Sequence, residues 1–212
     1  MALLTGCSIA PILPRMPVTS AAQPALSLDP TRNWITGARR VVSPNCDARP
    51  SGTDIGLIVI HGISLPPGQY GGPYIDQLFT NTLDAGAHEY FAEIAALRVS
   101  AHLFVDRHGA VTQYVPLTQR AWHAGKSAFR GRVACNDFSI GIELEGCDDE
   151  PYSEVQYQAA VALVHILMTA WPAIGPDCVV RHSDIAPGRK TDPGPAFDWR
   201  KFLSLVASRD RA

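Results

Sequence analysis

The pattern of hydrophobic and polar positions predicts alternating strands and helices. Residues 55–61 form a continuous apolar run rich in β-branched side chains, which is typical of a strand buried on both faces. Residues 138–146 alternate apolar and other side chains, which is strand periodicity. Residues 99–106 and 110–115 are further strand candidates, and the Gly-containing turn at 107–109 between them predicts a hairpin.

Helical periodicity is clearest at residues 153–170, where the apolar side chains fall on one face. Ser153 and Gln156 have the spacing of a capping box at the start of this helix. Residues 74–82 and 199–207 are shorter helix candidates. Because strands and helices alternate but a hairpin is included, we expect an α/β fold with a central mixed β-sheet flanked by helices in a single domain.

The two ends of the chain lack such periodicity. Residues 1–28 carry several prolines among small residues and are predicted to be a flexible tail. The domain is expected to cover residues 29–208, followed by a short C-terminal tail at 209–212. The tetrapeptide ending in Cys7 resembles a bacterial lipoprotein processing box, but the residues before it lack the charge and length of a signal, so we interpret it as chance.

Composition narrows the classes of partner. The chain has 212 residues and a net charge of −2, without a run of Lys or Arg, so nucleic acid is not an expected partner. No apolar stretch approaches the roughly 20 residues of a membrane helix, so a membrane is not expected either. Five widely spaced cysteines without a C-x-x-C motif favour reduced thiols and a cytoplasmic location. We expect the protein to act as a monomer.

The segment most informative for chemistry covers residues 181–194, after a short predicted strand at 178–180. It holds many charged side chains among two prolines and two glycines, so it is predicted to be a loop rather than a buried strand or helix. Loops held by a rigid scaffold often carry function. If this loop folds back, His182 and Asp192 could bind one metal ion, with Lys190 beside them.

His61 ends the first predicted strand, just before a Gly- and Pro-rich loop, which is a common site position in α/β folds. A lone histidine in that place is more often structural. Together with His182 and Asp192, however, it would provide two imidazoles and one carboxylate with an open fourth position, as in catalytic zinc sites. Spacing alone is a weak signal, because the H-E-x-x-H helix motif is absent.

Several other polar residues have two interpretations each. Glu143 and Glu145 point to the same side of their strand. One of them could be a general base or a partner of a metal ligand, and the alternative is the solvated face of an edge strand. Lys190 could stabilise an oxyanion, or it could be a surface lysine. Trp122 and His123 could line a cleft, or they could be a core Trp and a solvent-facing His.

At these positions the sequence resembles the zinc-dependent N-acetylmuramoyl-L-alanine amidases of the type 2 family, which share a fold with peptidoglycan-recognition proteins. The resemblance extends in order over most of the domain, and it is greatest to family members that act on 1,6-anhydro-muropeptides in cell-wall recycling. The segments that carry it are residues 61–68, 98–102, 120–125, 135–146 and 181–195.

The resemblance implies a zinc ion (Zn2+) bound by His61, His182 and Asp192. It implies a central mixed sheet flanked by helices, in agreement with the hydrophobic pattern. The implied substrate is a muropeptide that carries 1,6-anhydro-N-acetylmuramic acid, and the implied reaction is hydrolysis of the amide between the lactyl group and L-alanine.

The resemblance also implies roles for residues around the metal. Glu143 matches the catalytic acid/base, and Lys190 matches the lysine that stabilises the oxyanion. Arg98 and Trp122 fall in segments that line the substrate cleft of the family. One departure is that the family pattern has Asn after the first ligand histidine, where this chain has Gly62.

Two other classes of function are weighed against the amidase. The first is a peptidoglycan-binding protein on the same scaffold that does not cut its ligand. Such relatives typically lack part of the ligand set, which is complete here. The second is a hydrolase with Ser64 or Cys135 as nucleophile, but no G-x-S-x-G motif occurs and the thiols have no catalytic signature nearby.

Overall fold

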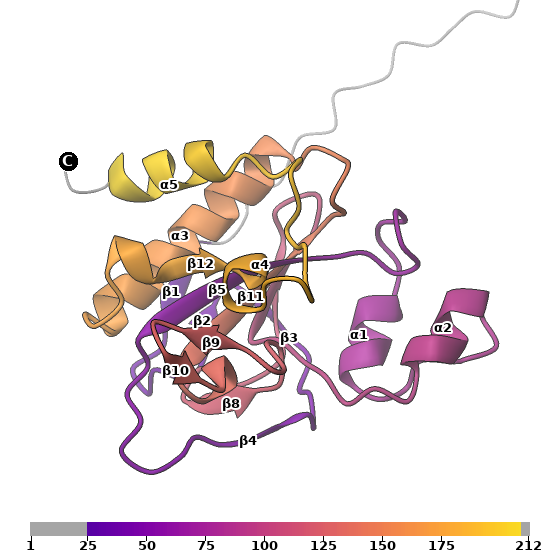
Figure 1. Ribbon diagram of the computed structural model, residues 1–212, viewed down its shortest axis with the longest axis horizontal. Coiled ribbons are helices and arrows are strands. Elements are labelled where there is room, and N and C mark those ends of the chain that lie inside the picture. Colours follow the sequence, from indigo (N-terminus) through magenta and orange to yellow (C-terminus); the bar gives the residue numbers. More distant parts are fainter. Residues whose placement is uncertain (1–24, 209–212) are drawn as a thin grey trace, which may run out of the picture.

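A six-stranded mixed sheet forms the centre of the computed structural model, which describes residues 25–208 (Figure 1). Its strand order is β12–β5–β11–β6–β7–β3. Strands β12, β5, β11 and β6 are mutually parallel, and β7 pairs antiparallel with β6 through the predicted hairpin. The expected fold class is confirmed. The strands are β3 (Arg39–Arg40), β5 (Leu57–Ile63), β6 (Leu103–Val105), β7 (Val111–Gln113), β11 (Ser139–Glu145) and β12 (Val179–Arg181).

Two helices, α3 (Glu154–Ala170) and α5 (Trp199–Ala207), cover one face of this sheet (Figure 1). Alternate residues of the central strands, among them Ile60 and Ile142, pack with them in the main core. Helix α3 begins with the predicted capping box, in which the Ser153 hydroxyl accepts the Gln156 N–H and the Gln156 side chain accepts the Ser153 N–H. The core therefore fixes the central strands from one side.

The opposite face of the sheet carries a smaller apolar cluster and the polar ends of the strands. Leu57 and Val59 of β5 pack there with Ile185, which belongs to the short helix α4 (His182–Ile185). Because side chains alternate along a strand, the next residue of β5 on this face is His61. Glu143 of β11 is its register partner. The sheet thus brings both polar side chains together near the carboxyl ends of β5 and β11.

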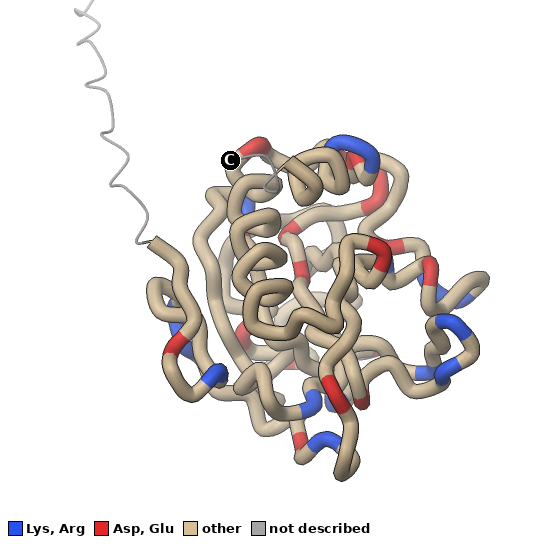
Figure 2. The backbone as a smooth tube through the Cα atoms, turned by 90° about the vertical axis from the view of Figure 1, so that its left-hand side faces the viewer, with Lys and Arg blue, Asp and Glu red and all other residues tan. Residues whose placement is uncertain are grey.

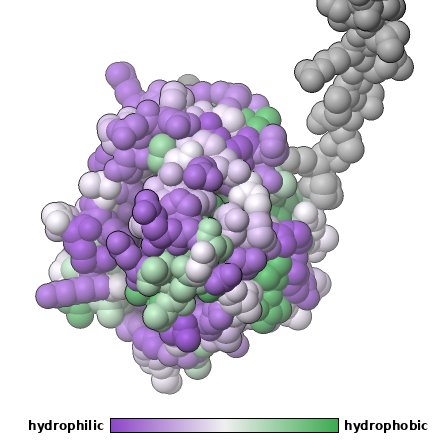
Figure 3. All heavy atoms as spheres, turned by 90° about the vertical axis from the view of Figure 1, so that its right-hand side faces the viewer, coloured by the Kyte–Doolittle hydropathy of each residue, from purple (hydrophilic) through white to green (hydrophobic). Residues whose placement is uncertain are grey.

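Two short helices, α1 (Tyr74–Phe79) and α2 (Glu89–Ile94), lie apart from the others, on the right of Figure 1. They enclose a second apolar cluster that includes Phe91 and Tyr114. Figure 3 shows the molecule from this side, where hydrophobic residues reach the surface in separate spots rather than as one patch. Only α1 was predicted, with its end placed at Thr82 rather than at Phe79, and α2, which has the same length of six residues, was not predicted.

The remaining elements are pairs of very short strands and two 3₁₀ turns, none of which the sequence pattern predicts. They connect the larger elements and shape the edges of the domain. They are β1 (Ser27–Leu28) with β2 (Ile35–Thr36), β4 (Cys46–Ala48) with β8 (Gln119–Ala121), β9 (Ala128–Phe129) with β10 (Arg132–Val133), η1 (Cys135–Asp137) and η2 (Pro176–Cys178).

Two expectations about segment boundaries are corrected. The predicted start of the domain at Asp29 is too late, because β1 precedes it and Leu28 packs against the main core. The polar segment 181–194 is not entirely loop: it begins with α4, where the Asp184 carboxylate accepts the Arg181 N–H and Ile185 is buried. The Cys7 motif and residues 209–212 lie outside the described residues.

Positive and negative residues are interspersed along the backbone in Figure 2. None of the helices within residues 25–208 has the length and apolar character needed to cross a membrane.

Candidate metal centre and active site

A cleft of about 590 Å³ opens at the carboxyl ends of β5 and β11. Polar and charged side chains line one part of it, and apolar side chains of the α1–α2 region line another. The polar part contains His61, Glu143, His182, Lys190 and Asp192, and the apolar part contains Leu78, Phe79, Tyr90, Ile94 and Leu97. Five of the seven site residues predicted from the sequence therefore lie in one cleft.

Three potential metal ligands meet at one point of this cleft. The Nδ1 atoms of His61 and His182 are 2.9 Å apart, and Asp192 Oδ2 is 3.3 Å from the first and 3.0 Å from the second. Tetrahedral zinc with bonds of about 2.0–2.1 Å places its ligand atoms roughly 3.3 Å apart. The triangle therefore has nearly the size that one zinc ion requires.

The hydrogen bonding of His182 leaves an electron pair for a metal. Its Nε2 lies 3.3 Å from the Ala124 carbonyl oxygen, which can only accept a hydrogen bond. Nε2 therefore carries the proton, and Nδ1 presents a lone pair to the triangle, as metal-binding histidines do. His61 is buried, and this burial lowers its pKa to about 4, so the His61 imidazole is neutral at neutral pH.

Glu143 completes the polar part of the cleft. Its Oε1 is 3.9 Å from His61 Nδ1, and its Oε2 is buried without a hydrogen-bond partner. Burial raises the pKa of Glu143 well above its usual value, and the Asp192 carboxylate raises it further while the Lys190 ammonium opposes the shift. Such an unsatisfied carboxyl is costly unless it faces a ligand. The donor set and this orphaned oxygen fit a metal site.

The edge-strand interpretation of the two glutamates is wrong, because β11 lies inside the sheet between β5 and β6. The two glutamates nevertheless differ. The Glu145 carboxylate accepts the backbone N–H groups of Gly71 and Arg107, so it joins two loops to the sheet. Only Glu143 lines the cleft that holds the ligand triangle.

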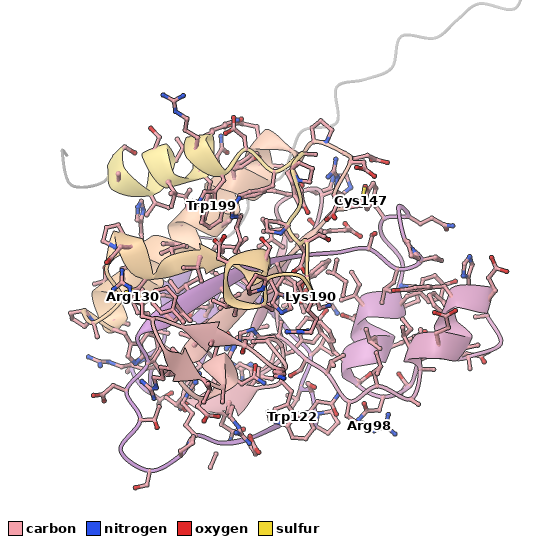
Figure 4. All side chains as sticks on the ribbon, viewed as in Figure 1. Arg98, Trp122, Arg130, Cys147, Lys190 and Trp199 are labelled. Carbon is pink, nitrogen blue, oxygen red and sulfur yellow. The ribbon has the colours of Figure 1, made fainter. Side chains whose placement is uncertain are left out.

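Lys190 follows α4 and projects near the centre of the view in Figure 4. It is exposed and lines the cleft beside Asp192. Arg98 and Trp122 lie elsewhere, at the lower edge of that view. The Trp122 indole donates to Asp47, and the Arg98 guanidinium donates to the carbonyls of residues 96 and 97. Neither side chain is part of the cleft lining that contains the triangle.

The alternative nucleophiles lack the surroundings of a catalytic serine or cysteine. Cys135 is fully buried, and this burial raises the pKa of its thiol. Ser64 lines the cleft, but its hydroxyl accepts the Gly68 N–H within its own loop. Nucleophilic catalysis needs a base within hydrogen-bond reach. No such base contacts either side chain among the hydrogen bonds of residues 25–208.

Sequence reasoning missed two side chains that lie beside the three potential ligands. The sequence analysis did not decide whether His123 lines a cleft or faces solvent. In the structure, its Nδ1 lies 2.9 Å from His61 Nε2. Tyr152 was not considered, and its buried hydroxyl donates to the carbonyl of Pro193, next to Asp192. Neither contact has a local signal, because the partners are 62 and 41 residues apart in the chain.

Tyr152 also gives a physical account of Gly62. A Cβ at position 62 would collide with the Tyr152 hydroxyl and lie 3.3 Å from Pro193 Cα, and the Tyr152 ring itself packs against Gly146. The side chain that the family pattern has after the ligand histidine therefore does not fit this arrangement. In this chain, the space is filled by Tyr152.

We expect Gly62→Ala to lower the free energy of unfolding by about 1–3 kcal/mol, since an added methyl in a packed site forces its neighbours to move. The same substitution in a Tyr152→Phe background should cost less, because the colliding oxygen is gone. Urea denaturation of the four proteins measures both effects. An unchanged unfolding free energy in Gly62→Ala would show that Tyr152 moves freely.

The buried His-His-Asp triangle and the adjacent carboxyl, in a cleft of a mixed α/β fold, fit a metal-binding enzyme, a class that includes the metal-dependent hydrolases. The comparisons with known proteins narrow this class. The chain belongs to the N-acetylmuramoyl-L-alanine amidase family, whose sequence profile matches residues 51–195. The expected family and enzyme class are confirmed.

The similarity to known relatives extends over most of the chain. The 1,6-anhydro-N-acetylmuramyl-L-alanine amidase AmpD of Salmonella typhimurium (strain SL1344) is 56% identical over 178 residues, which cover 84% of this chain and 95% of the relative. The crystal structure of a selenomethionine AmpD derivative superimposes with a TM-score of 0.81 at 55% identity, covering 84% of this chain and 98% of that one.

A second solved structure contains a ligand. It is the complex of the Escherichia coli amidase AmiD with anhydro-N-acetylmuramic acid-L-Ala-D-γ-Glu-L-Lys. It is 31% identical with a TM-score of 0.53, and the match covers 74% of this chain and 60% of that one.

Proposed function

We propose that this protein hydrolyses the amide bond between the lactyl group of 1,6-anhydro-N-acetylmuramic acid and L-alanine, in the recycling of muropeptides. Zinc is the proposed metal, with His61, His182 and Asp192 as its ligands. The observation that carries the proposal is the convergence of these three donor atoms beside the buried Glu143 carboxyl, in a chain that belongs to the amidase family.

The names of the relatives support the proposal that the substrate is an anhydromuropeptide. The AmpD relative is named for the 1,6-anhydro muropeptide, and the AmiD structure contains a peptide attached to the anhydro sugar. The apolar part of the cleft, formed by the α1–α2 region, offers a surface beside the metal centre against which part of such a ligand could pack. On the basis of these two names, we propose a soluble anhydromuropeptide as the substrate.

An amide is a poor electrophile with a poor leaving group, so its hydrolysis needs activation of the carbonyl and a proton for the nitrogen. Zinc, when bound, supplies Lewis acidity toward the carbonyl and lowers the pKa of water. Glu143 is proposed to take the proton of the attacking water and to deliver it to the alanine nitrogen. A cation in the triangle would favour the ionised form of this carboxyl, which is the form that accepts the proton.

Lys190 is proposed to stabilise the negative charge that develops on the carbonyl oxygen. Its ammonium group is a compact charge on a flexible stem, and the side chain lines the cleft beside Asp192. A cation placed where charge develops lowers the barrier of acyl transfer. Arg98 and Trp122 are not included in the proposed substrate contacts, because their side chains bond elsewhere.

We also propose a monomer in the cytoplasm. The four cysteines among the described residues are all free, which is the usage expected in a reducing compartment. Light scattering of the purified protein and fractionation of cells test these two statements independently of the reaction.

Removal of the metal tests the proposed function directly. We expect a chelator to abolish release of free peptide from soluble anhydromuropeptide, and added zinc to restore it. Mass spectrometry of the products identifies the bond that is cut, and polymeric cell wall serves as the comparison substrate. Full activity in metal-free protein would contradict the proposal. Tight muropeptide binding without turnover in zinc-loaded protein would favour the binding-protein alternative.

A further inference from the structure

His123 joins His61 to the backbone through a chain of hydrogen bonds. Its Nδ1 is 2.9 Å from His61 Nε2, and its Nε2 is 3.0 Å from Ser139 Oγ. The Ser139 hydroxyl in turn lies 2.6 Å from the Cys135 carbonyl oxygen. The three side chains come from β5, the segment after β8 and β11, so the tertiary structure alone brings them together.

The donor and the acceptor of each hydrogen bond in this series follow from its last member, the Cys135 carbonyl. The Cys135 carbonyl can only accept, so the single Ser139 hydroxyl proton points to it. Ser139 Oγ then presents a lone pair to His123, whose Nε2 must carry the ring proton. His123 Nδ1 is therefore an acceptor, and the proton between the two imidazoles belongs to His61 Nε2. His61 Nδ1 is left as a bare lone pair that faces the triangle.

The reversed arrangement of donors and acceptors would be less stable. If His61 carried its proton on Nδ1, this proton would point into the triangle, and His123 would have to reverse its own tautomer. Ser139 would then have to turn its proton toward His123 Nε2. The buried Cys135 carbonyl would lose its 2.6 Å hydrogen bond from Ser139 and would be left with the longer one from the Phe138 N–H, at 3.2 Å, and the loss of a buried hydrogen bond is destabilising.

The fold also fixes the plane of the His123 ring. A single side-chain oxygen, Asn136 Oδ1, accepts the backbone N–H groups of His123 and Ala124. The ring lies over Gly141 of β11, where a Cβ would be 2.6 Å from His123 Cγ and Nδ1. The His61 and His123 rings meet edge to face, with centroids 5.0 Å apart. The acceptor is thus held in a defined position.

We propose that His123 is a positioning residue for the metal centre, which holds His61 in the tautomer and orientation that present Nδ1 to the metal. Ser139 and the Cys135 carbonyl set the direction of the hydrogen bonds. His61 is thereby anchored through His123 to a backbone carbonyl, as His182 is anchored directly to that of Ala124. This inference rests on the metal site of the proposed function.

The test compares His123→Leu with His123→Asn. The two replacements have nearly the same shape, but only Asn offers an oxygen that can accept a hydrogen bond near the position of Nδ1. The zinc dissociation constant is measured by competition with a chromogenic chelator, and thermal unfolding of the metal-free proteins is measured in parallel.

We expect His123→Leu to weaken zinc binding by about 10- to 100-fold, which is typical for loss of a hydrogen-bond partner of a ligand histidine. His123→Asn should recover at least half of this loss on a logarithmic scale. A residue that only fills space would change metal-free stability without separating the affinities of the two variants. Equal zinc affinities of wild type and His123→Leu, or equal losses in the two variants, would overturn the proposal.

Ser139→Ala provides a second variant if His123→Leu does not fold. It removes the acceptor for His123 Nε2, so His123 is no longer held in one tautomer. We therefore expect zinc binding to weaken by several-fold. An unchanged zinc affinity would overturn the assigned donors and acceptors. All affinities are taken relative to the wild type. Failure of the wild type to bind zinc or to cleave muropeptide would contradict the proposed function instead.

Discussion

Glu143→Gln is expected to lower kcat on anhydromuropeptide by about 10²- to 10⁴-fold, which is the usual contribution of a general acid or base. Gln has nearly the shape of Glu but cannot exchange a proton. Since Glu143 lies beside the triangle rather than in it, with Oε1 3.9 Å from His61 Nδ1, zinc should still bind. The zinc content of the purified variant and its kcat are therefore measured on the same sample.

Glu145→Gln is the matched control for this prediction. It lies two residues further along β11 on the same side of the strand, but its carboxylate accepts backbone N–H groups of two loops instead of facing the cleft. We expect it to lower stability and to leave kcat of the folded enzyme close to the wild-type value. If Glu143→Gln kept full kcat, the proposed acid/base role would be lost. A loss of zinc in that variant would instead make Glu143 a metal ligand.

Lys190→Met is expected to lower kcat by about 10²- to 10³-fold, which is the effect of removing one group that stabilises an oxyanion. Met retains the apolar stem of Lys and removes only the charge. The side chain is exposed at the cleft, so the substitution should not change the free energy of unfolding. Steady-state kinetics with zinc-saturated enzyme measure the effect.

Lys126→Met is the control for a general loss of positive charge, because Lys126 is exposed and does not line the cleft that contains the triangle. We expect it to keep the wild-type kcat. If Lys190→Met raised KM and left kcat unchanged, the ammonium would bind the substrate equally in its ground state and transition state. The assigned role in stabilising developing charge would then be wrong.

The elements predicted well are those long enough to show a period. The helix at 199–207 was predicted with its observed bounds, and the capping box at Ser153 was found where expected. By contrast, α4 has four residues and was missed, as were many strands of only two residues. Elements of this length are formed by tertiary contacts rather than by local preference.

The residues of the candidate site were also predicted only in part. The resemblance placed His61, His182 and Asp192 in one metal site, and the structure brings their donor atoms together. The roles of Glu143 and Lys190 remain predictions, although both line the cleft. Arg98 and Trp122 lie in segments that resemble the family, but their side chains form hydrogen bonds with other groups and are not part of the cleft lining. A motif places a residue in a segment and does not set where its side chain points.

The amino-acid sequence was sufficient to predict the fold class and the family, because these depend on periodic hydrophobic patterns and on motifs within short segments, and the same motifs named the three proposed ligands. The three-dimensional structure was needed to see which glutamate faces the cleft, that Tyr152 occupies the space of a side chain at position 62, and how His123 and Ser139 orient His61. Each of these depends on atoms that come within hydrogen-bond or van der Waals distance across separate elements. The position of Glu143, for example, follows from the parallel register of β5 and β11, which places it beside His61 at one end of the sheet.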